Sequence, residues 1–202
     1  MNKAFFFPGT FLLVAALLLA GCAGSPQVRF YALTPLEQPG PGFPPSQAEP
    51  PPSVTIAPIE IPDYLDRPQI VTREGENALT LAEFDRWAGS LRDNMSTVLM
   101  ENLSVLLGSK QIFVHPRIRT EQSDYLLALR VLRLDCTPGD QVLLKAQWTI
   151  FPGQNREGMT EMATLTEPLA DSRYETLAAA VSRVLARLSV EIAGNLRQGF
   201  RQ

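Results

Sequence analysis

The sequence has little of what most catalytic and metal sites require. It contains a single histidine, His115, and two cysteines, Cys22 and Cys136, in 202 residues. A histidine-based metal site needs more ligands than these side chains supply. Neither a glycine-rich phosphate loop nor the Gly-x-Ser-x-Gly spacing of serine hydrolases occurs. We therefore expect no metal, no cofactor and no enzymatic activity, and a membrane-anchored enzyme that uses His115 is the alternative.

An excess of basic residues is also missing. The chain has 18 lysines and arginines against 21 aspartates and glutamates, a formal net charge of −3. Binding to the phosphates of nucleic acids usually relies on a concentrated positive charge. This balance therefore predicts no nucleic-acid partner.

The N-terminal hydrophobic run is too short for a membrane span. It extends from Phe5 to Ala20 but is interrupted by residues 8–10, Pro-Gly-Thr, so it falls short of the roughly 20 apolar residues that cross a bilayer. Lys3 and the apolar run 11–19 have instead the order of a secretory signal. Residues 1–21 are therefore predicted to be a signal peptide.

The end of this signal resembles the lipobox of bacterial lipoproteins, in the run Leu19-Ala20-Gly21-Cys22. In such proteins signal peptidase II cuts before the cysteine, and the new N-terminus carries acyl chains. The resemblance predicts a lipidated Cys22, with residues 22–27 as a short tether. Ala23 stands where an Asp favours the inner membrane in enterobacterial lipoproteins, which indicates the outer membrane, facing the periplasm. The alternatives are an ordinary cleaved signal with Cys22 near the cut, and an uncleaved anchor.

Cys136 has no cysteine partner once Cys22 is acylated, so no internal disulfide is expected. It lies at the end of an apolar strand pattern. We expect it to be a small buried residue.

Residues 28–202 are predicted to form a single α+β domain, in which an antiparallel or mixed sheet packs against two long helices. The first helix, 90–107, has apolar residues at three- and four-residue spacing between Ser90 as cap and Gly108 as terminator. The second follows Ser172-x-x-Glu175, a capping-box pattern, and has an apolar face from Leu177 to Leu196.

Eight segments have strand patterns. Two of them, 69–73 and 78–81, flank a turn and predict a hairpin. Pro58 interrupts the pattern at 53–61 and predicts either an edge strand or a bulge. Segments 125–135, 141–151 and 159–166 predict an antiparallel meander, and the remaining strands are expected at 28–33 and 112–114.

Residues 35–52 form a loop with eight prolines, Pro35, Pro39, Pro41, Pro44, Pro45, Pro50, Pro51 and Pro52. Such a segment cannot donate a continuous hydrogen-bond ladder and favours an extended spacer. A plain connector is expected, and a proline motif that docks a partner is the alternative.

A loop bracketed by Pro62 and Pro68 contains Asp63-Tyr64-Leu65-Asp66-Arg67, and a second aromatic and charged cluster, 83–87, ends at Trp87. Trp, Tyr and Arg dominate the energetics of protein interfaces. We therefore predict a partner-binding surface. The alternative is that the two aromatic rings pack beneath the loops, while the charged residues satisfy backbone groups or each other. The candidate contact residues are Tyr64, Asp66, Arg67 and Trp87.

Three motifs together resemble the PqiC family, the auxiliary lipoproteins of ABC-type transport systems. They are Phe30-Tyr31-Ala32-Leu33, the run 61–71 and Leu81-x-x-Phe84-Asp85-Arg86-Trp87-Ala88.

The resemblance covers essentially all of the mature chain. It implies an accessory subunit of an MCE-type, PqiABC-like lipid transport system that supports membrane integrity. Such a subunit would sit at the outer membrane and dock the periplasm-spanning MCE-domain protein. Contact with further copies of the chain in a homo-oligomer is a second expectation. An outer-membrane structural or assembly lipoprotein with no transport partner is the alternative.

Overall fold

The computed structural model describes residues 27–39, 51–115, 123–153 and 157–199. The predicted signal peptide, the predicted lipidation site at Cys22 and residues 40–50 of the proline-rich loop lie outside these ranges. The described elements are β1 (Arg29–Tyr31), β2 (Val54–Ile56), η1 (Asp63–Leu65), β3 (Gln69–Glu74), β4 (Ala78–Trp87), α2 (Leu91–Leu107), β5 (Ile112–Val114), β6 (Tyr125–Thr137), β7 (Gln141–Pro152), β8 (Met159–Pro168) and α3 (Tyr174–Gly199).

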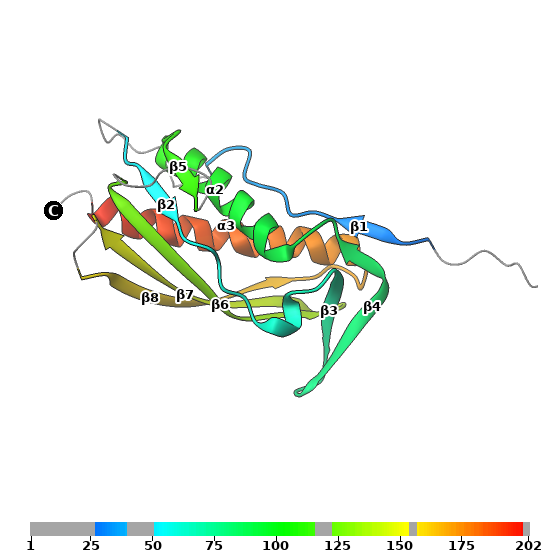
Figure 1. The fold of residues 1–202 in the computed structure, drawn as a ribbon. Coiled ribbons are helices and arrows are strands. Elements are labelled where there is room, and N and C mark those ends of the chain that lie inside the picture. Colours follow the sequence, from blue (N-terminus) through cyan, green and yellow to red (C-terminus); the bar gives the residue numbers. More distant parts are fainter. Residues whose placement is uncertain (1–26, 40–50, 116–122, 154–156, 200–202) are drawn as a thin grey trace, which may run out of the picture.

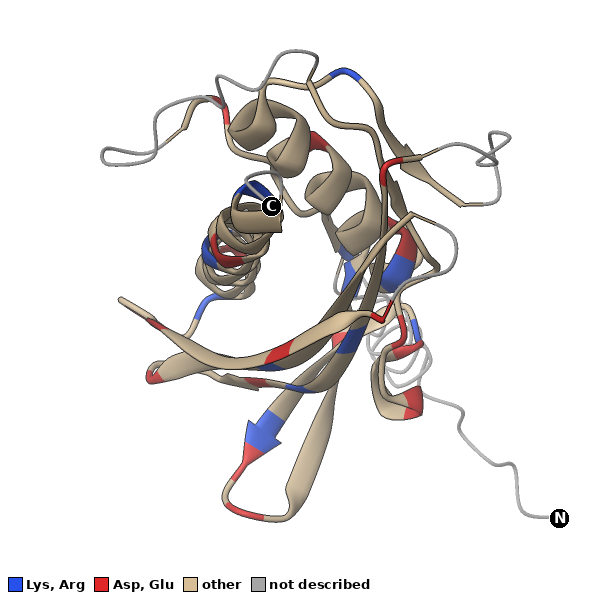
Figure 2. Cartoon of the chain, turned by 90° about the vertical axis from the view of Figure 1, so that its left-hand side faces the viewer, with Lys and Arg blue, Asp and Glu red and all other residues tan. Residues whose placement is uncertain are grey.

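The strands form two mixed sheets, a five-stranded one in the order β5-β2-β6-β7-β8 and a three-stranded one in the order β1-β4-β3. Both helices lie on the same face of the larger sheet (Figures 1 and 2). Alternate residues of β7 point to them and are buried, since successive side chains of a strand face opposite sides. The predicted α+β class and the antiparallel meander, β6–β7–β8, are confirmed.

The first predicted helix is confirmed with both of its ends. Ser90 Oγ accepts a hydrogen bond from Asp93 N at 3.3 Å, and Gly108 ends α2 with φ of 63°. A side chain at Gly108 would be strained there, because this left-handed conformation suits glycine.

The second helix is confirmed and begins at Tyr174. The carboxylate that accepts a backbone hydrogen bond at this end belongs to Asp171, whose Oδ1 lies 2.9 Å from Arg173 N. The predicted apolar face is buried against α2, β7 and β8. Its residues are Leu177, Val181, Leu185, Leu188, Ile192 and Leu196.

The strand predicted at 53–61 is interrupted at Pro58, as a bulge rather than as an edge. β2 ends at Ile56 and lies between β5 and β6, so the edge-strand expectation is wrong. Ala57 N donates to Leu127 O at 2.8 Å, and Glu60 N donates to Leu129 O at 3.0 Å. The segment thus advances three residues, from Ala57 to Glu60, while β6 advances two, from Leu127 to Leu129. The extra residue forms a bulge, and Pro58, which has no N–H to donate, lies in it.

The smaller sheet is built on the predicted hairpin. Gly75 turns it with φ of 72°, but β4 continues to Trp87, so the charged cluster before α2 is part of a strand. An ion pair joins the two sheets, since Arg73 Nε of β3 lies 2.7 Å from Asp135 Oδ1 of β6. Asp135 is 5% exposed and also pairs with Arg133.

Cys136 is buried, as predicted, at 2% exposure. Burial, assisted by Asp135, raises the pKa of its thiol from 9.0 to about 12. The folded chain therefore keeps the proton at a pH where the unfolded chain loses it. The stability that this thiol contributes is complete below pH 9 and is lost as the pH rises towards 12.

We expect native protein to resist a thiol-specific reagent at pH 8 and to react at residue 136 only after unfolding. The Cys136→Ala variant should lose less stability than the parent between pH 9 and pH 12 in chemical denaturation. Reaction of the native thiol at the rate of the unfolded chain would contradict this burial.

Candidate functional site

The Pro62–Pro68 loop is held as a short helical turn. Leu65 N donates to Pro62 O at 2.9 Å, and Asp66 N donates to Asp63 O at 3.2 Å. Leu65 is 4% exposed and packs into the core. The turn thus has a rigid inner side and presents Asp66 and Arg67, both exposed, on its outer side.

The side chain of Tyr64 is only partly exposed at this surface. Its ring packs against the hydrophobic core, and burial raises the pKa of its hydroxyl, with a hydrogen bond to the Leu134 backbone acting in the opposite direction. Part of the predicted hot-spot aromatic is therefore used to attach the loop to β6.

Asp66 connects the loop to α2. Its Oδ2 lies 2.8 Å from Arg92 Nη2, and both side chains are about two-fifths exposed, at 44% and 40%. A pair this exposed contributes about 0–1 kcal/mol, so its main effect is to orient the loop. Arg92 was missed at the sequence level, because a single charge in the first turn of a helix does not identify a partner 26 residues away.

Arg67 differs from its neighbours. Its backbone N donates to Leu65 O at 2.8 Å, while its guanidinium makes no hydrogen bond or ion pair with any other residue in the described ranges. A guanidinium carries five N–H donors in a planar fork. Arg67 is thus the residue of this loop best placed to bind a carboxylate or carbonyl group of a partner.

Trp87 is hydrogen-bonded to the loop through its backbone. Its N donates to Pro68 O at 2.7 Å, but its side chain is 4% exposed and belongs to the core. This is the alternative in which an aromatic ring packs beneath the loop. Trp87 is therefore excluded as a contact residue, and the candidates that remain for the predicted surface are Tyr64, Asp66 and Arg67.

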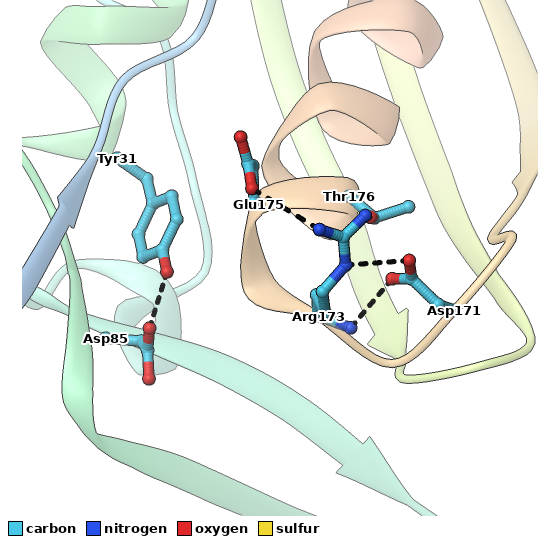
Figure 3. Close-up of polar contacts among 6 residues, drawn as sticks. All are labelled: Tyr31, Asp85, Asp171, Arg173, Glu175 and Thr176. Carbon is cyan, nitrogen blue, oxygen red and sulfur yellow. Dashed lines mark hydrogen bonds and ion pairs between the residues drawn. The ribbon is translucent and has the colours of Figure 1, made fainter.

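A second polar cluster holds β1, the first described strand after Cys22. Asp85 of β4 is 5% exposed and accepts from Arg29, with Oδ1 2.9 Å from Nε and Oδ2 3.0 Å from Nη2. Tyr31 Oη donates to Asp85 Oδ1 at 2.7 Å (Figure 3). Burial and this hydrogen bond raise the pKa of Tyr31 to about 12. The cluster thus attaches β1 to β4 with a buried charge.

The chain that follows β1 runs over both helices, and we call residues 33–36 the N-terminal strap. Three of its backbone N–H groups donate to side chains of the helices: Leu33 to Asn94 Oδ1 at 3.0 Å, Thr34 to Ser182 Oγ at 3.1 Å and Leu36 to Asn102 Oδ1 at 2.7 Å. A hint in the sequence is Asn102, a polar residue on the apolar face of its helix.

Side chains of the metal-binding types are scattered over the described ranges. In these ranges no three His, Cys, Asp or Glu side chains gather where they could hold a metal ion. His115 is exposed at the end of β5. Among the helices that the structure describes, none has the length and apolar character needed to cross a membrane.

Residues 31–193 match the family model described as the ABC-type transport auxiliary lipoprotein component. The chain belongs to this family. The resemblance to PqiC-like proteins is therefore confirmed at the level of the family. Such a lipoprotein acts as an auxiliary component of a transport system, which implies protein partners and membrane anchoring. No curated protein matches the chain significantly.

Two solved structures are similar to this auxiliary lipoprotein in fold. One is protein XCC0632 from Xanthomonas campestris, of family DUF330, with 19% identity, a TM-score of 0.70 and coverage of 87% of this chain and 98% of that one. The other is an uncharacterized protein with 17% identity, a TM-score of 0.63 and coverage of 87% and 99%. At these identities the likeness establishes the fold alone.

A dodecameric PelC from Paraburkholderia phytofirmans is more distant. It has 12% identity, a TM-score of 0.44 and coverage of 74% of this chain and 91% of that one. The likeness is too low to bear on how the auxiliary lipoprotein assembles.

Proposed function

We propose that the chain is an outer-membrane-anchored auxiliary lipoprotein of an MCE-type, PqiABC-like lipid transport system. Its folded domain docks the periplasm-spanning MCE-domain protein. The family match over residues 31–193 is the observation that carries the proposal. The lipobox at Cys22 and the motifs at 30–33, 61–71 and 81–88 support the more specific assignment.

This role requires no catalysis by the chain. Exposing an acyl chain to water costs about 0.8 kcal/mol for each methylene, so a lipid conduit has to end close to the bilayer. A domain anchored by several acyl chains can hold the end of a partner at that distance, and the energy for transport comes from other components of the system.

The docking surface in this proposal is formed by Tyr64, Asp66 and Arg67. The turn between Pro62 and Pro68 is held by its own backbone hydrogen bonds and by the buried Leu65. A loop that is already ordered loses little conformational entropy on binding. The exposed guanidinium of Arg67 then supplies directional contacts, and Asp66 with Arg92 keeps the loop oriented.

We expect Arg67→Ala to weaken capture of the MCE-domain protein about 30-fold, since a hot-spot arginine contributes about 2 kcal/mol. The measurement is affinity capture from detergent-solubilised membranes with a tagged, full-length chain. Arg130→Ala is the matched control, because Arg130 is also well exposed, at 57%, and lies on β6 in a surface pair with Glu60.

Tyr64 requires two variants because its ring also packs. Tyr64→Phe retains the packing, whereas the double variant Tyr64→Ala with Arg67→Ala removes the surface. Unchanged capture by the double variant would overturn this docking surface but leave the function standing. Capture that yields no MCE protein, permease or ATPase would favour the outer-membrane assembly role instead.

A further inference from the structure

Phe30 of β1 is the most exposed large hydrophobic side chain in the described ranges, at 63%. It lies close in sequence to the anchor, since only residues 23–28 separate Cys22 from Arg29. Seven residue steps, each advancing an extended chain by at most about 3.6 Å, give a maximum reach of about 25 Å. In the fold, β1 and the N-terminal end of α3 lie at one end of the molecule and the described C-terminal end of α3 at the other (Figure 1).

The N-terminal strap keeps β1 from separating from the rest of the domain. Its three hydrogen bonds to the helices, and the Asp85 cluster, hold β1 to the rest of the fold. Because β1 is fixed to the fold, an anchor at Cys22 holds the end of the domain that carries Phe30 near the membrane.

A pocket of about 500 Å³ lies beside Phe30, between residues 29–31 and 172–175. Arg29 and Arg173 line it with side chains that are 65% and 69% exposed, and Glu175 is 80% exposed. Arg173 Nε lies 2.8 Å from Asp171 Oδ2, and its Nη1 lies 3.8 Å from Glu175 Oε2 (Figure 3).

The charges around this pocket do not favour an anionic surface. Asp85, Asp171 and Glu175 outnumber the two guanidiniums that they face. Arg29 uses Nε and Nη2 for Asp85 and still has Nη1 for another acceptor. An arginine donor and an exposed carboxylate that line the same pocket match a headgroup that carries both a phosphate and an ammonium group.

We propose that this end of the domain is a membrane-contact surface for zwitterionic phospholipid. Phe30 enters the interface between headgroups and acyl chains, and the pocket receives a phosphoethanolamine headgroup. Arg29 binds the phosphate and Glu175 the ammonium. Anchored and interfacial proteins place aromatic side chains at this depth. The inference rests on the proposed anchoring at Cys22.

The test uses the full-length mature lipoprotein in vesicles of phosphatidylethanolamine and phosphatidylcholine with brominated acyl chains. Phe30→Trp adds a fluorophore at the surface, and Met162→Trp adds a matched one on β8, where Met162 is 51% exposed. The native Trp87 and Trp148 are 4% and 3% exposed and give the background. Equal unfolding temperatures would show that both variants retain the fold.

We expect bromine to remove about half of the emission added by Phe30→Trp, since an interfacial side chain lies about 5–10 Å deep. Emission added by Met162→Trp should persist, and phosphatidylglycerol should not increase the quenching. The mass of the N-terminal peptide shows whether Cys22 is acylated. If it is acylated and the two variants are quenched equally, the contact surface is overturned and the anchor stands. An unacylated Cys22 would overturn both, and quenching that requires phosphatidylglycerol would overturn the zwitterionic assignment.

Discussion

A chain whose residues 1–22 are replaced by an ordinary cleavable signal should leave the membrane fraction and fail to restore transport. This is the largest effect that we expect, because Cys22 is the predicted site of the anchor. Each acyl methylene contributes about 0.8 kcal/mol, so several acyl chains make an anchor effectively permanent. Without them, docking becomes an encounter between free molecules, and avidity falls by about 10²- to 10⁴-fold.

The measurements are fractionation of the envelope and complementation of a deletion strain that is sensitive to detergents. The matched control has the same foreign signal but retains Leu19-Ala20-Gly21-Cys22 at the cut. Thermal unfolding of the unanchored chain should equal that of the parent, since the described fold starts beyond the anchor. If the unanchored form complemented fully, the anchor would have no part in the function.

Asn102→Ala should cause the second large effect, a loss of about 1–3 kcal/mol in the free energy of unfolding. Asn102 has no exposed surface. Its Oδ1 accepts from Leu36 N at 2.7 Å, and its Nδ2 donates to Ser189 Oγ at 3.0 Å. Alanine removes the acceptor of the Leu36 N–H and the donor to Ser189 Oγ, which is fully buried, and a buried polar group that loses its partner costs the desolvation penalty.

The check is thermal or denaturant unfolding, in which a domain of this size loses about 2–4 °C of melting temperature for each kcal/mol. Asn94→Ala is the matched control, because the Asn94 side chain accepts a hydrogen bond from Leu33 N and lies closer to solvent than Asn102. We expect the control to lose less stability. Equal unfolding of Asn102→Ala and the parent would show that the strap does not depend on this side chain.

The two helices were predictable because their signals are local. Ser90, Gly108 and apolar residues at three- and four-residue spacing define α2 within about twenty consecutive positions. Pro58 shows the limit of such signals. A proline within a strand pattern indicates that the hydrogen-bond ladder is interrupted, but it does not distinguish an edge strand from a bulge. That distinction depends on which strands from distant parts of the chain lie on either side.

The candidate site was predictable only as a set of residue types. Tyr64, Arg67 and Trp87 looked alike as hot-spot residues, yet Trp87 is in the core and Arg67 is exposed. Asp66 and Asp85 find their partners, Arg92 and Arg29, at separations of 26 and 56 residues. Nothing in the spacing of these charges indicates such pairs.

Local order along the chain is therefore enough to predict most of the helices and strands, and the motifs at 30–33, 61–71 and 81–88 indicate the family. It suffices because caps, turns and hydrophobic periods act over a few residues. The tertiary fold decided the strand order, the burial of Trp87, the strap across both helices, and the placing of Phe30 at the end that follows Cys22. These features depend on the packing of distant segments against one another, and burial is a property of that packing and not of a residue type.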